Sequence, residues 1–445
     1  MALLLLVAAL AGRAEAHATL ERAEPAPNSL VLKRLSGLSL VFSEPVDPTR
    51  IRIQVLDRRA RRVDRYVEVS PDRRSAAVQV EAREVGVYTV AWRVISQVDG
   101  HPSQGAYTVT VGALAPGAFA ELAGAERRLP PVPLALRWLT LLASLALAGC
   151  AMTWRLVIVP ALQETGAPDA SALSERVRAA LTKVGIAGAV AAATGNAAEM
   201  ALLIRQAADL AGGTAMGAVL ADALGSPPGR LIATRVVLAI TVAALLRRGG
   251  WPPLIAAAFL LLTHSLASHA GARGGAAVAA DWLHLAAAAA WVGGLAVVAF
   301  ALPPAWRGAD PGVRARLWGT LVARFSRTAA ASVALLVATG VYAAMQHVPA
   351  VRELRDTLYG LTLIAKIALL LPVLALAAVN RFLLRPRLEQ AARAPADPEA
   401  AARTRRTFLR TVRAESALSL AVVLAAAALT ILPPARNAAT LPYQY

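Results

Sequence analysis

Residues able to bind a metal occur at the start of the chain. The leader "MALLLLVAALAGRAEA" is apolar and ends in Ala14-Glu15-Ala16, the small-x-small pattern at which secretory signal peptides are cut. It departs from the usual pattern in having no Lys or Arg before the apolar run. We therefore predict a signal peptide over residues 1–16. Cleavage there makes His17 the mature N-terminus, with a free α-amine beside an imidazole.

A second pair of metal-binding side chains lies in "VISQVDGHPSQGAYTVTV". Asp99 and His101 stand between two strand patterns, and residues two apart in an extended chain project to the same side. With His17 they can supply up to three nitrogens and one carboxylate oxygen, a donor set that suits tetragonal Cu(II). Asp-Gly alone is a common turn pair, so the hypothesis depends on the combination.

These side chains belong to a stretch that reads as an all-β module over residues 17–112. Short alternating runs such as "LSLVFS", "IRIQVLD" and "VYTVAWRV" are separated by turn residues. About seven strands in under a hundred residues predict a Greek-key β-sandwich. The alternation is lost over 113–132, which we interpret as a linker.

The rest of the chain has the composition of a membrane protein. The 445 residues are 57% hydrophobic, with a mean hydropathy of +0.53, and the apolar residues form long runs. The net charge of +18 lies largely in arginines between those runs, which favours lipid contact and topology over nucleic-acid binding. The single cysteine, Cys150, excludes an internal disulfide and a cysteine-based metal site.

Residues 133–435 therefore predict an all-α polytopic membrane domain of about eight transmembrane helices, followed by a tail over 436–445. Each expected span has about twenty residues, enough to cross a ~30 Å hydrocarbon core. The stretch 207–224 is interrupted by Gly and Asp, and we predict a re-entrant or interfacial segment there. The expected spans are 134–157, 180–204, 230–247, 252–270, 277–302, 321–346, 359–382 and 413–433.

Arginine placement gives the expected orientation. With the N-terminal module outside, the arginine-rich loops at 247–250, 306–318 and 381–413 all fall inside, as the positive-inside rule requires. We expect a multi-pass protein of the bacterial inner membrane with its N-terminal module in the periplasm.

Histidines inside a membrane are functional candidates by default. His264 and His269 end one expected span, whereas Asp281 and His284 open the next. Asp281 and His284 share a helix face, and His264 and His284 each lie about 10 Å deep. His284 is the leading predicted intramembrane metal ligand and His264 the second. His269, Asp281, Met345 and His347 are further candidates, and Met200 with Glu199 is a weaker one.

The β module resembles the periplasmic copper-resistance family CopC. The motifs "HATLERAEPAPNS", "LVFSEPVD" and "DGHPSQGAYTVTVG" carry the resemblance. It implies that His17, Asp99 and His101 ligate Cu(II) and that Glu44 lies close to them without ligating. Some members add a methionine-rich Cu(I) site, which we expect to be absent because residues 17–112 contain no Met.

The membrane half, from about 135 to 435, resembles the CopD family of copper-resistance inner-membrane proteins. Its motifs are "HSLASHA", "DWLHLAAAAAWVGGL", "RFSRTA", "LVATGVYAA", "DTLYGLTLIAKIALL" and "LALAAVNRFLL". The resemblance implies delivery of periplasmic copper to, and across, the inner membrane. Expected partners are copper ions, the bilayer and periplasmic copper carriers, with no nucleic acid.

Two other functional classes stay open at this point. His264 and His284, on adjacent helices, could ligate a haem axially in a redox protein. A membrane-tethered copper sensor or buffer would bind copper without transporting it. We expect no enzyme, since the sequence has no P-loop and no nucleophile elbow.

Overall fold

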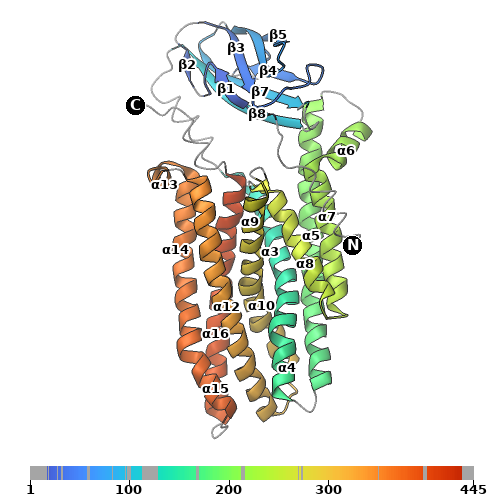
Figure 1. Ribbon diagram of the computed structural model, residues 1–445, viewed down its shortest axis with the longest axis vertical. Coiled ribbons are helices and arrows are strands. Elements are labelled where there is room, and N and C mark those ends of the chain that lie inside the picture. The colour runs from blue at the N-terminus through green and yellow to red at the C-terminus, as the bar shows by residue number, and fades with distance from the viewer. Residues whose placement is uncertain are drawn as a thin grey trace. The chain divides into compact units, whose positions relative to one another are not determined.

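The computed structural model describes residues 18, 20–27, 29–31, 34–57, 61–82, 84–95, 97, 102–112, 129–166, 170–211, 216–268, 270–271, 274–348, 350–393 and 398–432. Two compact units make up this part of the chain, a β unit that ends at residue 112 and a helical unit that begins at residue 129 (Figure 1). The predicted signal peptide, most of the predicted linker and the predicted tail lie outside the described residues.

The β unit is a sandwich of two four-stranded sheets. One sheet has the order β1-β3-β6-β5 and the other β2-β8-β7-β4, with β2 parallel to β8 and the other pairs antiparallel. The described residues thus contain eight strands where about seven were expected. The strands are β1 (Leu20–Glu24), β2 (Leu30–Val31), β3 (Leu35–Phe42), β4 (Arg52–Leu56), β5 (Asp64–Val69), β6 (Ser75–Ala82), β7 (Gly86–Ile95) and β8 (Pro102–Val111).

Alternation along the strands builds the sandwich core. In β6 every second side chain is buried, because successive side chains of a strand point to opposite faces. Those buried residues pack with Leu40, Phe42, Val55 and Val90, so both sheets contribute to one apolar cluster. The predicted two-residue alternation is therefore confirmed, and it places apolar side chains of both sheets in one core.

The helical unit contains seven helices long and apolar enough to cross a membrane within the described ranges. They run side by side along the unit in Figure 1. A shorter apolar helix, α8 (Pro252–Leu266), occupies the place of the fourth expected span, 252–270. The seven are Pro131–Thr165, Ala170–Arg205, Pro228–Leu246, Gly275–Ala305, Pro311–His347, Leu358–Arg393 and Glu399–Ile431.

The named helical elements subdivide these spans. They are α3 (Pro131–Thr153), η1 (Trp154–Ile158), α4 (Val159–Thr165), α5 (Ala170–Ala211), α6 (Met216–Gly225), α7 (Pro227–Leu246), α9 (Gly275–Ala288), η3 (Ala289–Gly293), α10 (Gly294–Ala296), η4 (Val297–Ala301), α11 (Leu302–Ala305), α12 (Pro311–His347), α13 (Glu353–Asp356), α14 (Leu358–Val379), η5 (Asn380–Leu384), α15 (Arg385–Arg393) and α16 (Pro398–Ile431). The η elements are π-helical segments.

Several helices extend beyond their apolar stretch. α5 begins ten residues before the expected span at 180, and α16 begins fifteen residues before the one at 413. The added turns are rich in charged residues that favour a helix in water. The ten residues of α6, within the expected re-entrant segment, span only about 15 Å, which is shorter than a bilayer core.

α3 and η3 cross at a pair of glycines. A Cβ on Gly149 would lie 2.5 Å from the Cα of Gly293, and a Cβ on Gly293 would lie 2.3 Å from the carbonyl oxygen of Leu145. Small residues let membrane helices approach backbone to backbone. Next to them, a Cβ on Gly294 would lie 2.6 Å from the Phe325 ring. The two glycines of "WVGGL" are thus required for packing.

Candidate functional site

The three predicted copper ligands of the β unit, His17, Asp99 and His101, lie outside the described residues. Their described neighbours are nevertheless well fixed. Ala18, next to His17, is fully buried in the sandwich core. On the other side, β7 ends at Ile95 and β8 begins at Pro102, and these two residues are paired.

The residues that follow His17 and those that precede Asp99 contact the end of β3 or the segment 43–47 that comes directly after it. The first residue of β1, Leu20, pairs with Phe42 at the end of β3. The backbone N–H of Asp47 donates to the carbonyl of Ile95 over 2.8 Å. The N–H of Gln97 donates to the carbonyl of Pro45, also over 2.8 Å. The described residues after His17 and before Asp99 therefore lie next to the same short stretch, residues 42–47.

That segment contains Glu44, the residue expected near the site. Glu44 is half-buried. The Arg74 guanidinium donates to the carbonyl of its neighbour Ser43, and Arg73 donates to the Gln97 amide over 2.9 Å. The segment is thus held to the sandwich by side chains as well as by the backbone.

Packing below this edge explains another part of the motif. Gly105 of β8 pairs with Trp92 of β7, and a Cβ on Gly105 would lie 2.7 Å from the indole ring. The same indole meets Phe42 edge to face, with centroids 5.4 Å apart. Gly105 therefore leaves room for a ring that supports the end of β3.

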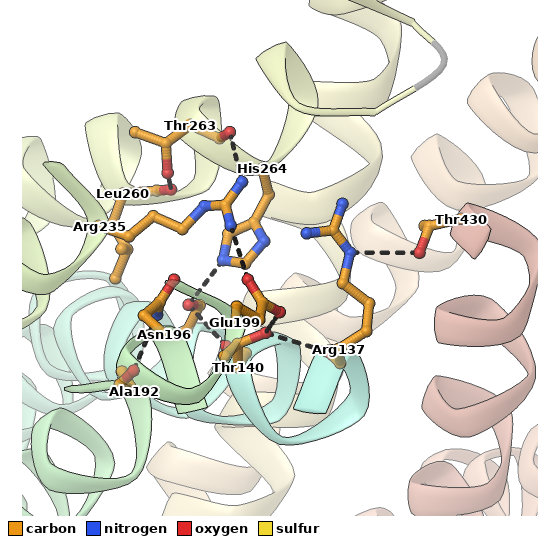
Figure 2. A network of polar contacts seen from close by, with 11 residues as sticks. Arg137, Thr140, Ala192, Asn196, Glu199, Arg235, Leu260, Thr263, His264 and Thr430 are labelled. Atoms are coloured by element: carbon orange, nitrogen blue, oxygen red, sulfur yellow. Dashed lines mark hydrogen bonds and ion pairs between the residues drawn. The ribbon is translucent and has the colours of Figure 1, made fainter. Parts of the chain in front are cut away.

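In the helical unit, His264 belongs to a buried polar network (Figure 2). Its Nε2 atom lies 2.9 Å from the Ser144 hydroxyl of α3, and the residue is 4% exposed. Thr140, one turn away on α3, donates to Glu199 of α5 over 3.3 Å. The network joins α3, α5, α7 and α8 near the end of the unit at which α3 begins.

The network contains charged groups, and Arg235 of α7 is the most central of them. Its guanidinium lies 3.5 Å from the Glu199 carboxylate and donates to the carbonyl of Thr263 over 3.2 Å. Arg235 is 2% exposed. Arg137 approaches from α3 and donates to Thr430 over 3.3 Å. Two guanidinium groups and one carboxylate give this region a net positive charge, which disfavours a cation at His264.

The second polar group surrounds His284 of α9. Its Nδ1 atom lies 2.8 Å from the Thr339 hydroxyl of α12, which leaves Nε2 as the nitrogen that Thr339 does not engage. One turn earlier, Asp281 accepts a hydrogen bond from Ser268 over 3.3 Å. Lys366 of α14 interacts electrostatically with both Asp281 and His284. Asp281 and His284 thus lie in one region, beside Lys366.

The remaining candidates lie apart from these groups. Met345 is 76% exposed. The Nδ1 atom of His347 lies 2.6 Å from the carbonyl of Ala343, and its ring stacks on Tyr359 with centroids 5.8 Å apart. His269 lies outside the described residues. Over the described ranges, the structure contains no group of three or more His, Cys, Asp or Glu side chains that could hold a metal ion.

A carboxylate that the sequence analysis missed lies deeper in the unit. Glu415 of α16 accepts hydrogen bonds from the Trp291 indole over 3.0 Å and from the Asn380 amide over 2.9 Å. It is 2% exposed. The motifs "WVGGL" and "AAVNRFLL" contain its two donors, but nothing in their spacing connects them to position 415.

The fold defines a membrane protein of several spans whose chain begins with a β-sandwich. Residues 20–112 match the family described as CopC domain, and residues 319–429 match the family described as Copper resistance protein D. The chain therefore joins a CopC domain to a CopD domain. The CopD match is narrower than the 135–435 over which its motifs occur, so it includes Thr339, Lys366 and Glu415 but not His264 or His284.

The chain is also similar to individual known proteins. The chain is 28% identical over 462 residues to "Copper transport protein CutJ" of Bacillus subtilis (strain 168), covering 99% of this chain and 79% of the relative. The crystal structure of CopC from Methylosinus trichosporium OB3b is 28% identical and covers 22% of this chain and 98% of its own, with a TM-score of 0.21. PcoC, a copper resistance protein from Escherichia coli, is 26% identical, covering 21% and 98%, with a TM-score of 0.20.

Proposed function

We propose that this protein captures Cu(II) with its β unit and transports copper across the inner membrane in copper homeostasis and resistance. His17, through its imidazole and α-amine, Asp99 and His101 would ligate the ion, with Glu44 beside them. The CopC and CopD domains and the similarity to a copper transport protein support copper binding and transport.

One structural observation carries the capture step. The described residues after His17 and before Asp99 are hydrogen-bonded or paired to residues 42–47, and Pro102, after His101, pairs with Ile95. Donors from distant parts of the sequence can therefore reach one ion. Three nitrogens and an oxygen form the donor set that Cu(II) prefers.

We place the membrane entrance at Asp281 and His284. Thr339 orients the His284 ring through Nδ1, as hydrogen-bonded partners of ligating histidines do. His264 stays a second candidate, but the arginines around it favour a role in helix packing. We further propose that the β unit lies in the periplasm and receives copper from periplasmic copper carriers. Copper would then be reduced and pass through the membrane as Cu(I).

The haem alternative loses its geometric basis. An axial pair needs an iron-facing nitrogen on both imidazoles, whereas the Nε2 atom of His264 bonds to Ser144 of α3. A transport assay distinguishes a membrane-tethered sensor from a transporter, because proteoliposomes that contain a sensor would not accumulate copper. The matched families are copper-resistance families, and we propose a transport role without catalysis.

The capture step is tested on the full chain. Mass spectrometry should find His17 at the mature N-terminus, and electron paramagnetic resonance should show a tetragonal Cu(II) signal with nitrogen ligands. His17→Ala, Asp99→Asn and His101→Ala should each weaken Cu(II) binding about tenfold or more, equal to ~1.4 kcal/mol. Asp72→Asn, at an exposed aspartate of the β unit, is the matched control. A different mature terminus, or unchanged affinity in His17→Ala, would refute the proposed ligand set.

A further inference from the structure

Glu415 is a buried charge-bearing group that the proposed copper route does not use. Both of its carboxylate oxygens accept hydrogen bonds from neutral donors, Oε1 from Trp291 of η3 and Oε2 from Asn380 of η5. Ionisable residues inside membrane proteins are costly and commonly functional. π-helical segments also occur frequently at functional sites. Two such segments supplying its partners single out Glu415.

A cavity of about 280 Å³ lies beside this carboxylate. Its walls are mostly aliphatic and aromatic, and polar groups come from Trp291, Ser326, Asn380, Arg381 and Glu415. Glu415 and Arg381 are the charged residues among those that line it. The volume exceeds that of one water, and Ser326, Asn380, Arg381 and Glu415 offer hydrogen-bonding partners, so a water there can carry a proton to the carboxylate.

We propose that Glu415 is a proton-binding site, which takes up and releases one proton in each transport cycle. This inference depends on the proposed transport function for its physiological meaning. A metal ion would need several ligands, and the described residues contain no His, Cys, Asp and Glu group of that size. A proton needs a single carboxylate.

The neighbouring groups can satisfy both protonation states. The ionised carboxylate accepts from Trp291 and Asn380, while the Asn380 carbonyl oxygen accepts from the Thr411 hydroxyl over 2.5 Å. After protonation at Oε2, a half-turn of the Asn380 amide lets its oxygen accept the new O–H. Thr411 then accepts from the rotated amide and donates to the carbonyl of Phe408, 2.8 Å away. The indole of Trp291 donates to Oε1 in both states.

Nearby cations have other partners. Arg381 of η5 donates to the carbonyl and hydroxyl oxygens of Ser326 over 2.9 and 3.0 Å. Arg324 of α12 pairs with Glu164, and Arg413 of α16 lies 5.8 Å from the centre of the Phe300 ring. Glu415 is therefore held by hydrogen bonds to neutral groups and can change its charge without breaking an ion pair described here.

The position of Glu415 suits proton exchange with the arginine-rich side of the membrane. It lies two residues beyond Arg413 and five beyond Arg410, and the Arg381 side chain lines the same cavity. Arginines gather at the cytoplasmic ends of spans. A proton would thus travel from the arginine-rich side through the cavity to Oε2.

Infrared difference spectroscopy on the full chain tests the proton site directly. A change of pH should produce a protonated-carboxyl band that is lost in Glu415→Gln and moves in frequency in Trp291→Phe, which removes one hydrogen-bond donor. Glu399→Gln, at an 87% exposed glutamate of the same helix, is the matched control and should leave the band unchanged. If Glu415→Gln retains every protonated-carboxyl band of the wild type, the proposal is overturned.

Copper uptake into proteoliposomes tests the coupling. A pH gradient should change the initial uptake rate of the wild type several-fold, and Glu415→Gln should lose that dependence while Cu(II) binding by the β unit persists. Equal gradient dependence in both proteins overturns coupling through Glu415. Absence of uptake by the wild type at every pH contradicts the transport function instead, and the infrared band still decides the proton site.

Discussion

The Nδ1 atom of His284 lies 2.8 Å from the Thr339 hydroxyl, although 55 positions separate the two residues. The same hydroxyl donates to the carbonyl of Leu335 one turn earlier on α12 over 2.6 Å. It therefore has one hydrogen in use and acts toward His284 as an acceptor, so Nδ1 carries the ring proton. The lone pair of His284 is then on Nε2, where it can bind a metal ion.

Loss of the Thr339 hydroxyl should impair copper transport without unfolding the protein. Thr339→Val keeps the shape but frees the His284 ring, and comparable losses of a ligand's orienting partner lower metal affinity or activity about 10–100-fold. Initial copper uptake in proteoliposomes measures the effect. Thr328→Val, which removes only a bond to the Arg324 carbonyl on the same helix, is the control. Equal uptake by Thr339→Val and wild type would show that Thr339 does not position a transport ligand.

Breaking the Arg235–Glu199 pair should destabilise the helical unit. Glu199→Gln leaves a guanidinium that is 2% exposed without its carboxylate, next to Arg137, and such losses cost about 3–5 kcal/mol. The thermal midpoint of the purified protein should fall, and the double variant Glu199→Gln/Arg235→Gln should recover part of the loss. If the single and double variants unfold at the same temperature, the pair is not coupled.

The glycine crossing makes a sharper packing prediction. Gly149→Ala places a methyl group 2.5 Å from the Cα of Gly293, where only backbone can move, and overpacking of this kind costs about 1–3 kcal/mol. Gly217→Ala is the matched control, since nothing lies within 4 Å of its added Cβ. Size-exclusion profiles after a heating series would compare them. Equal survival of the two variants would mean that α3 and η3 can separate at little cost.

Asp64 should make the stability of the β unit sensitive to acid. Burial alone would raise its pKa, but hydrogen bonds from the Arg62 guanidinium and the Val55 N–H hold the pKa of this carboxyl below its usual value. Its contribution to stability is therefore complete above the ordinary aspartate pKa and is lost as the pH falls through the lowered value. Hydrogen exchange at the Val55 amide, followed from neutral to acid pH, measures this loss.

Two substitutions at position 64 separate the contributions. Asp64→Asn keeps an acceptor for Val55 and loses only the pair with Arg62, whose side chain is 59% exposed, so the cost should stay below about 1 kcal/mol. Asp64→Ala leaves the Val55 N–H without its acceptor and should cost about 1–3 kcal/mol. Equal exchange rates at Val55 in the two variants would contradict this division.

Local patterns predicted the elements of this protein well. The two-residue period of β6 and the apolar stretches of the spans arise from neighbours in sequence, so both could be read directly. The starts of α5 and α16 could not be predicted in this way, because their first turns are charged and hydropathy detects only the apolar part of a helix. The expected span at 252–270 is the shorter helix α8, whose fifteen residues are also apolar.

The polar partners inside the helical unit were harder to foresee. Asp281 and His284 share a face because they are three residues apart, whereas Thr339 and Lys366 reach them from other helices. Glu415 lies near the start of the expected span 413–433, and nothing in the neighbouring sequence distinguishes it. Its donors stand 124 and 35 positions away, and only the folded chain brings them together.

The position of Cys150 has a chemical consequence for a protein that handles copper. It is the only cysteine in the sequence, and its side chain, one residue after the glycine crossing, is 1% exposed. Copper ions readily oxidise accessible thiols, and this chain presents none to its cargo. Burial thus protects this thiol from copper-driven disulfide crosslinking between molecules, and it keeps Cys150 from acting as a reductant for bound copper.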